Sequence, residues 1–125
     1  MSKAVHNDVI DAALDLIATA NIMTLCSQEP TTRTEAITTY MLIDVTMTAG
    51  DGNGDYTIAD GTVSGRKLTV TAQASETVTN TGTGNHIAFC DGTTLLYVTT
   101  CTPVGVTAAG TESFAALVIE LRDPS

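Results

Sequence analysis

The sequence has no tryptophan and few aromatic or basic side chains. Its 125 residues include three tyrosines and two phenylalanines, and five basic residues stand against 14 acidic ones, which gives a net charge of -9. The basic residues are scattered along the chain, at Lys3, Arg33, Arg66, Lys67 and Arg122. Phosphate groups would repel such a chain, so nucleic acid and anionic membrane surfaces are excluded as partners. The scarcity of aromatic platforms argues against a glycan site.

Long apolar runs, a leader segment and an even set of cysteines are also missing. The longest apolar run, around Phe114 to Ile119, suits a strand and is far shorter than a membrane helix. The residues Met1 to Ala4 lead into aspartates rather than an apolar stretch, so we expect no secretory signal. The three cysteines have no metal-ligand spacing, which favours buried, reduced thiols made in a reducing cytoplasm, at Cys26, Cys90 and Cys101.

Threonine is the most abundant residue, with 24 copies. It is an uncharged, stiff strand former that suits the solvent-facing side of a sheet. The chain length is close to the common size of one domain, and 43% of the residues are hydrophobic, enough for one core. We therefore expect a single globular domain over residues 1–125.

The beginning of the chain predicts a helix over about residues 7–20. Apolar residues follow helical spacing and predict one buried stripe, formed by Val5, Val9, Ile10, Ala13, Leu14, Ile17 and Ala18. Aspartates on the other side predict a solvated face, at Asp8, Asp11 and Asp15. Asn7 is the expected N-cap, and Asn21 is the residue expected to end the helix in the left-handed conformation.

A β domain over about residues 22–121 follows, because the apolar period changes to two. The expected strands are residues 22–27, 40–47, 56–59, 67–74, 86–90, 95–101 and 114–121. Within residues 67–74 the inward positions are Leu68, Val70, Ala72 and Ala74. The strand over 86–90 pairs with 95–101 around the turn Asp91–Gly92. Further turns or connections are expected at residues 28–31, 49–55, 60–61, 82–85 and 102–110.

The fold class predicted by this pattern is mainly β. About seven or eight short strands, one N-terminal α-helix and no second helix for crossovers indicate an antiparallel β-sandwich or small barrel.

The segment Asp51-Gly52-Asn53-Gly54-Asp55 places oxygen-bearing side chains at alternate positions, as a calcium loop does. Tyr56 stands where that template needs glycine, and Thr62 stands where it needs a bidentate glutamate. Asp60 adds one further carboxylate. Turn chemistry is therefore the favoured interpretation, and calcium binding is the alternative.

The remaining residues with reactive, metal-binding or charged side chains do not form a recognisable motif. His6 and His86 have no nucleophile elbow, Ser64–Gly65 fits a turn, and the cysteines with His86 lack the paired spacing of zinc sites. The glycines at 50, 52 and 54 lack the spacing of a phosphate loop. The pair Arg66–Lys67 is interpreted as charge at a strand edge. We expect no catalytic, cofactor-binding or metal-binding residues and no enzyme activity.

Several segments resemble small virion structural proteins of tailed bacteriophages, of the head decoration or accessory type. They cover most of the chain: residues 7–18, 25–32, 35–36, 58–61, 64–70, 82–88 and 121–124. The resemblance implies a structural role in the virion and brings no catalytic or ligand residue. It implies a protein made in the host bacterial cytoplasm and assembled into the particle.

The expected function is therefore that of a multi-copy, non-enzymatic capsid decoration protein that stabilises the head. Its expected partners are the major capsid protein or other virion proteins, and copies of itself, for example as a trimer; the N-terminal helix or the segment before it is the expected contact. One alternative is a structural protein of the tail, tail tip or fibre involved in adsorption. An alternative of another class is a calcium- or glycan-binding β module.

Overall fold

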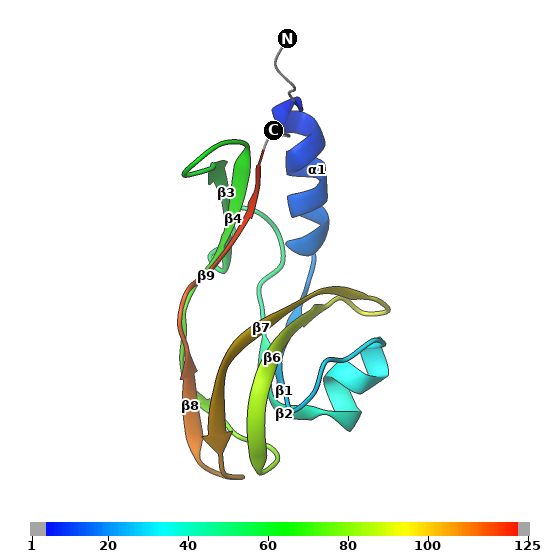
Figure 1. Cartoon of the computed structure of the whole chain (residues 1–125), viewed down its shortest axis with the longest axis vertical. Helices are drawn as coiled ribbons and strands as arrows, with labels where there is room; N and C mark the ends of the chain where they lie inside the picture. The colour runs from blue at the N-terminus through cyan, green and yellow to red at the C-terminus, as the bar shows by residue number, and fades with distance from the viewer. Residues whose placement is uncertain (1–4, 123–125) are drawn as a thin grey trace. The chain divides into compact units, whose positions relative to one another are not determined.

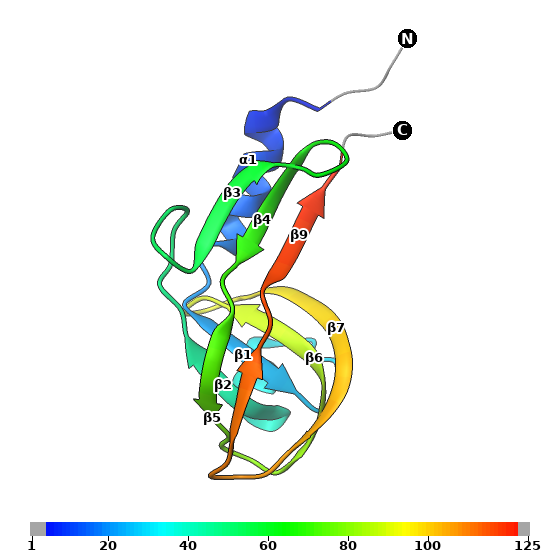
Figure 2. The same ribbon diagram turned by 90° about the vertical axis from the view of Figure 1, so that its left-hand side faces the viewer.

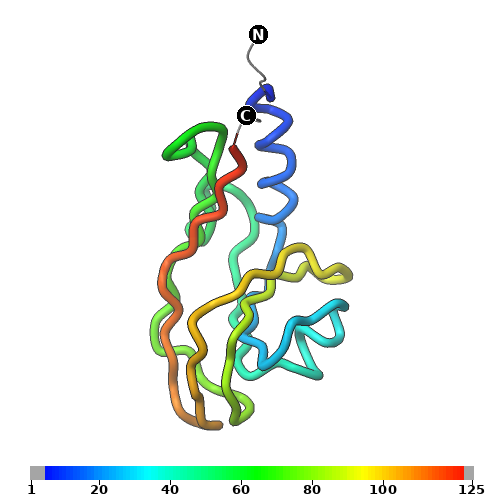
Figure 3. Tube along the Cα trace, in the orientation of Figure 1, coloured from blue at the N-terminus to red at the C-terminus, as the bar shows by residue number. Residues whose placement is uncertain are grey.

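The computed structural model describes residues 5–122, which form two compact units. The helix unit comprises residues 5–19, 48–72 and 115–122, and the sandwich unit comprises residues 20–47 and 73–114. The trace in Figure 3 follows the helix unit through the first, a middle and the last part of the chain. The expectation of one domain over residues 1–125 stays a prediction.

The helix unit combines one α-helix with a three-stranded antiparallel sheet. Its elements are α1 (Asn7–Ile17), β3 (Tyr56–Asp60), β4 (Arg66–Val70) and β9 (Leu117–Leu121). The strand order is β3-β4-β9, so β4 is the central strand. Figures 1 and 2 show α1 lying along one face of this sheet.

One face of the three-stranded sheet carries the core of the helix unit. The register places Leu68 of β4 opposite Ile58 and Ile119. Arg66 shares their face because side chains alternate along a strand, and it bonds Asp11 of α1. This face is therefore the one that the helix covers. The buried apolar side chains of the unit include Ile10, Leu14, Ala18, Tyr56, Leu68, Val70 and Ile119.

The helix differs from the prediction at both ends. His6, not Asn7, is the N-cap, and its Nδ1 accepts a hydrogen bond from the backbone N–H of Asp8 at 3.1 Å. The helix ends at Ile17, with Ala18 as the C-cap, and the Thr19 hydroxyl donates back to the Leu16 carbonyl at 2.6 Å. Asn21 does not have a positive φ; its N–H already donates to the Cys90 carbonyl in the sheet of the sandwich unit.

The sandwich unit has a four-stranded antiparallel sheet and a two-stranded ribbon. The sheet contains β1 (Ile22–Cys26), β2 (Met41–Thr46), β6 (Gly82–Cys90) and β7 (Leu95–Val106) in the order β2-β1-β6-β7. The ribbon pairs β5 (Gln73–Thr77) with β8 (Thr111–Phe114). Figure 2 shows the ribbon in front of the sheet, and Figure 1 shows a short helical turn, η1 (Glu35–Thr39), on the other side of the sheet.

The central strands of this sheet are buried on both faces. In β1 every residue from Met23 to Cys26 is buried, so neighbours that point to opposite faces are both covered. On the face of Cys26 lies a cluster with Ala36, Ala88 and Cys90, against which Ile37, Tyr40, Leu95 and Val98 pack. Ala36 and Ile37 belong to η1, a helical segment that the sequence pattern did not predict.

The expected fold class, mainly β with antiparallel sheets and one N-terminal α-helix, is confirmed, and the arrangement fits a small β-sandwich. The hairpin of β6 and β7 is also confirmed, since His86 lies opposite Thr100 and Cys90 opposite Leu95. Nine strands lie between residues 5 and 122. The number exceeds seven or eight because the expected strands over 67–74 and 114–121 each break in two.

Both of these breaks fall where the chain passes between units. The predicted inward positions Ala72 and Ala74 are exposed, because β4 ends at Val70 and the next strand belongs to the sandwich unit. A break at residues 115–116 likewise separates β8 from β9. Conversely, the predicted turn over 82–85 lies inside β6, and residues 102–106 of the predicted connection extend β7.

Candidate functional site

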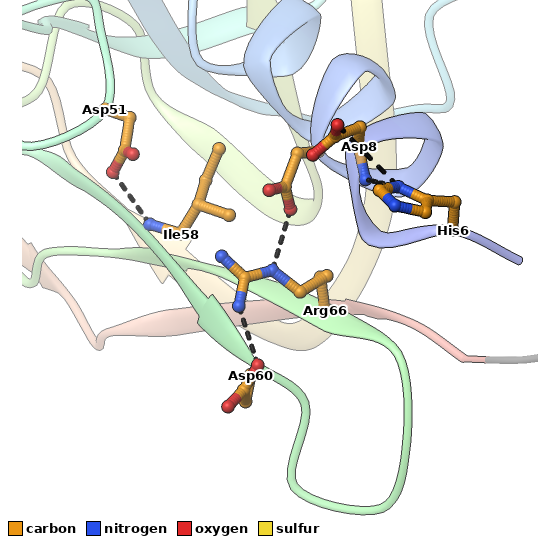
Figure 4. Close-up of polar contacts among 7 residues, drawn as sticks. His6, Asp8, Asp51, Ile58, Asp60 and Arg66 are labelled. Atoms are coloured by element: carbon orange, nitrogen blue, oxygen red, sulfur yellow. Dashed lines mark hydrogen bonds and ion pairs between the residues drawn. The ribbon is translucent and has the colours of Figure 1, made fainter.

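Arg66 joins the helix to the sheet of the helix unit. Its Nε donates to Asp11 Oδ1 at 2.8 Å and its Nη1 to Asp60 Oδ1 at 2.7 Å, as Figure 4 shows for Arg66 and Asp60. The hydrogen bonds to Asp11 and Asp60 raise the pKa of Arg66, so it stays charged. Its side chain is 20% exposed and that of Asp11 28%. The half-buried pair of Arg66 with Asp11 therefore links α1 to β4, and Asp60 adds an exposed partner for Arg66.

The contacts and position of Arg66 correct two predictions. Asp11 does not belong to a solvated face, because it is half-buried and paired with Arg66. Arg66 and Lys67 do not lie at a strand edge, because β4 is the central strand of its sheet. Lys67 faces the side away from the helix, where its Nζ donates to the Thr62 hydroxyl at 3.2 Å.

Glu120 closes the connection between β3 and β4. One carboxylate oxygen accepts the backbone N–H of Thr62, and the other pairs with Arg122 Nε at 2.7 Å. The bond from Arg122, followed by that from Thr62, holds the pKa of Glu120 below its ordinary value. The carboxylate of Glu120 therefore stabilises the connection between β3 and β4, which is a structural role.

The side chains of the loop that resembles a calcium site form hydrogen bonds with backbone groups of the residues on either side of it. Asp51 Oδ1 accepts from the Ile58 N–H at 2.8 Å (Figure 4), and Asp55 Oδ2 accepts from the Thr48 N–H at 2.5 Å. Asn53 donates to the Ala49 carbonyl at 2.9 Å. In the part of the chain that the structure describes, no three or more His, Cys, Asp or Glu side chains are grouped to hold a metal. These contacts support turn chemistry as the role of the loop.

The two histidines have local structural contacts. His6 caps α1 and lies 3.7 Å from a carboxylate oxygen of Asp8 (Figure 4), on the surface of the helix unit. His86 is half-buried in the sandwich unit, with Nδ1 2.6 Å from Asn85 Oδ1. Both contacts are with a residue one or two positions away; His6 acts as a helix cap, and His86 lies in the middle of β6.

The three cysteines are free, and two of them lie in the sandwich core. Cys26 and Cys90 are fully buried and Cys101 is half-buried. Burial raises the pKa of all three thiols. Raised pKa values keep the thiols protonated at neutral pH, the form that is a weak nucleophile and a poor metal ligand. The surroundings of the three thiols are those of small apolar side chains.

Asp91 organises the turn between β6 and β7. Its Oδ1 accepts from the backbone N–H groups of Thr93 at 2.8 Å and Thr94 at 2.6 Å, and these bonds lower its pKa. The Asp91 carbonyl accepts from Arg33 Nε at 2.8 Å. The turn predicted at Asp91–Gly92 is thus stabilised by the ionised carboxylate of Asp91, which accepts these hydrogen bonds.

We expect the variant Asp91→Asn to lose part of the acid sensitivity of the protein. A folded-state pKa below the ordinary value of 3.8 means that the ionised Asp91 stabilises the fold above that pH. This contribution is lost as the pH falls through the folded-state pKa. The wild type should therefore be the more stable above pH 3.8, with a difference in unfolding free energy that shrinks below it. Urea unfolding at several pH values measures this, and a pH-independent difference would contradict it.

Exposed apolar surface is concentrated on the helix unit. Among the described residues, four large apolar side chains are mostly exposed, and all belong to this unit: Val9 (63%), Leu16 (58%), Val63 (68%) and Val118 (52%). Val9 and Ala13 were expected in the buried stripe of α1, but both are exposed. The helix buries a narrower face than its apolar pattern predicted.

Comparisons with known proteins add no relative. No family model, no curated protein and no solved structure matches the chain. Between residues 5 and 122, no helix has the length and apolar character needed to cross a membrane. The resemblance to phage virion proteins therefore stays a prediction from the sequence.

Proposed function

We propose that the chain is a non-enzymatic structural component of a tailed-phage virion, bound in many copies to the capsid as a decoration or accessory protein. The observation that carries the proposal is the run of exposed apolar side chains along one face of α1, which includes Val9 and Leu16. Such surface is typical of proteins that bind other proteins. The segments that resemble small virion proteins are the reason for proposing a phage particle as the assembly.

The polar groups of the chain support a structural role. Arg66, Glu120 and Asp91 hold helix and turn contacts, and the side chains of the 51–55 loop bond nearby backbone groups. The proposed partners are the major capsid protein or other virion proteins, and further copies of the chain. The low density of charge suits a subunit that packs against others, while the excess of acidic residues favours solubility before assembly.

Quantitative mass spectrometry of purified virions tests the proposal. We expect a copy number comparable with that of the major capsid protein, and a gold-labelled antibody should bind to heads. A few copies per particle, with label on tails, would replace decoration by a tail or tail-tip role. Absence from washed particles would overturn a virion role altogether.

A further inference from the structure

The helix α1 carries a second apolar stripe, which the sheet does not cover. Val9, Ala12, Ala13 and Leu16 follow the spacing i, i+3, i+4, i+7, and all four are exposed. We call these four residues the outer stripe. With about 100° of turn per residue, Val9 and Leu16 lie about 20° apart around the helix axis. The outer stripe therefore forms one continuous band along α1, beside the buried face of Ile10 and Leu14.

Acidic side chains line the other border of the outer stripe. Asp8 and Asp15 are also seven residues apart, and about 100° of turn per residue places both of them about 40–60° from Ala12, on the side of the stripe that lies away from Ile10. Both are exposed. The helix has no basic residue, in its last turn or elsewhere. Asp11, the remaining aspartate of the helix, is paired with Arg66 and faces the sheet.

The acidic border of the outer stripe determines which kind of helix can bind there. If two copies of α1 paired antiparallel over their stripes, the Asp8 and Asp15 border of one copy would face the same border of the other. Like charges so placed repel, and the net charge of -9 adds to the repulsion. A helix that carries lysine or arginine along the facing border would instead form ion pairs with both aspartates. The alanines at 12 and 13 leave room for a close approach of two helices.

We propose that the outer stripe docks an amphipathic helix of a neighbouring protein, with small apolar residues on its contact face and basic residues along the border that meets Asp8 and Asp15. The inference rests on the proposed function only in taking that neighbour to be a virion protein. Contact between the apolar faces supplies the binding energy, and the aspartates set the orientation and exclude acidic helices.

A pair of synthetic helical peptides tests the inference with the full chain. Both have leucine and alanine on the contact face over about three heptads. One has lysine and the other glutamate at the border positions. Titration calorimetry should show saturable binding of the lysine peptide, weakened by added salt, and no binding of the glutamate peptide. Amide shifts in nuclear magnetic resonance should change over residues 8–16.

Matched variants locate the contact. Leu16→Ser should weaken binding of the lysine peptide at least about tenfold, which corresponds to about 1.4 kcal/mol. Val118→Ser changes an equally exposed apolar side chain of the same unit, outside α1, and should leave the affinity unchanged. Both positions are exposed, so circular dichroism should show folded protein for each variant.

Three outcomes would overturn the inference. They are the absence of binding by the lysine peptide, equal binding of both peptides, and self-association of the chain that Leu16→Ser abolishes, which would assign the stripe to a second copy. None of them bears on the copy number in virions. A chain that is abundant on heads and binds no basic helix would retain the proposed function and lose this inference.

Discussion

Replacing Leu14 by alanine is expected to lower the free energy of unfolding by about 2–5 kcal/mol. Leu14 has no exposed surface and lies in the middle of α1, facing the sheet of the helix unit. Truncation removes buried methyl groups and leaves a cavity, because the strands beneath are held in place by their ladder of hydrogen bonds. Urea unfolding followed by circular dichroism measures the loss.

The matched control is the same substitution two residues further along the helix. Leu16 is 58% exposed, so Leu16→Ala should change the unfolding free energy by no more than about 0.5 kcal/mol. Both variants place alanine in the same helix and change helix propensity equally. Similar losses for the two would contradict the assignment of the buried face.

Replacing Gly84 by valine is the second large effect, with an expected loss of about 3 kcal/mol. A Cβ atom at Gly84 would lie 2.4 Å from Leu25 Cγ and 2.5 and 2.6 Å from its methyl carbons. Leu25 is buried in the central strand β1, so it has little room to move. Overpacking then forces the side chain out of its rotamer or the strands apart. Denaturant unfolding gives the loss.

Two further variants separate this clash from a general cost of changing glycine. A Cβ at Gly105, in the partner strand β7, meets no atom within 4 Å, so Gly105→Val should be neutral or slightly stabilising. Leu25→Ala combined with Gly84→Val should cost less than the sum of the two single variants, because each removes part of the same conflict. Strictly additive losses of unfolding free energy would show that the Leu25 side chain does not occupy the space left by Gly84.

Gly84 also shows where sequence patterns lose information. The glycines at 82 and 84 predict a turn, because glycine is common where the chain reverses. In the structure they lie in β6, where the missing side chain of Gly84 leaves space for Leu25 and that of Gly82 leaves space for Leu42. A turn and a close approach across a sheet both require glycine, and only the residue on the neighbouring strand distinguishes them.

Features that depend on local periodicity were predicted well. The existence of α1, the strands β1, β2 and β3, and the hairpin of β6 with β7 all follow from apolar spacing within one short segment. The strand breaks at residues 71–72 and 115–116 could not be predicted, because alternation continues through positions where the chain changes units. The short helix η1 is only five residues long, too short for a stripe to be recognised.

The candidate surface was only partly predictable. Helical spacing identified Val9, Ala13 and Leu14 as one apolar stripe, but it could not divide that stripe into a buried and an exposed part. That division depends on which face of the helix meets the sheet, and Asp11 lies on the sheet side, where it pairs with Arg66. A contact between residues 55 positions apart has no local signal in the sequence.

The interleaving of the two units along the chain sets an order for their completion during synthesis. All strands of the sandwich unit have been made once Phe114 has been added, whereas the sheet of the helix unit needs residues 117–121. Since α1 is made before all the strands and β9 after the other eight, the sheet that packs against α1 is completed only once residues 117–121 have been added. The outer stripe on α1 is therefore presented in its final setting only after β9 has been synthesised.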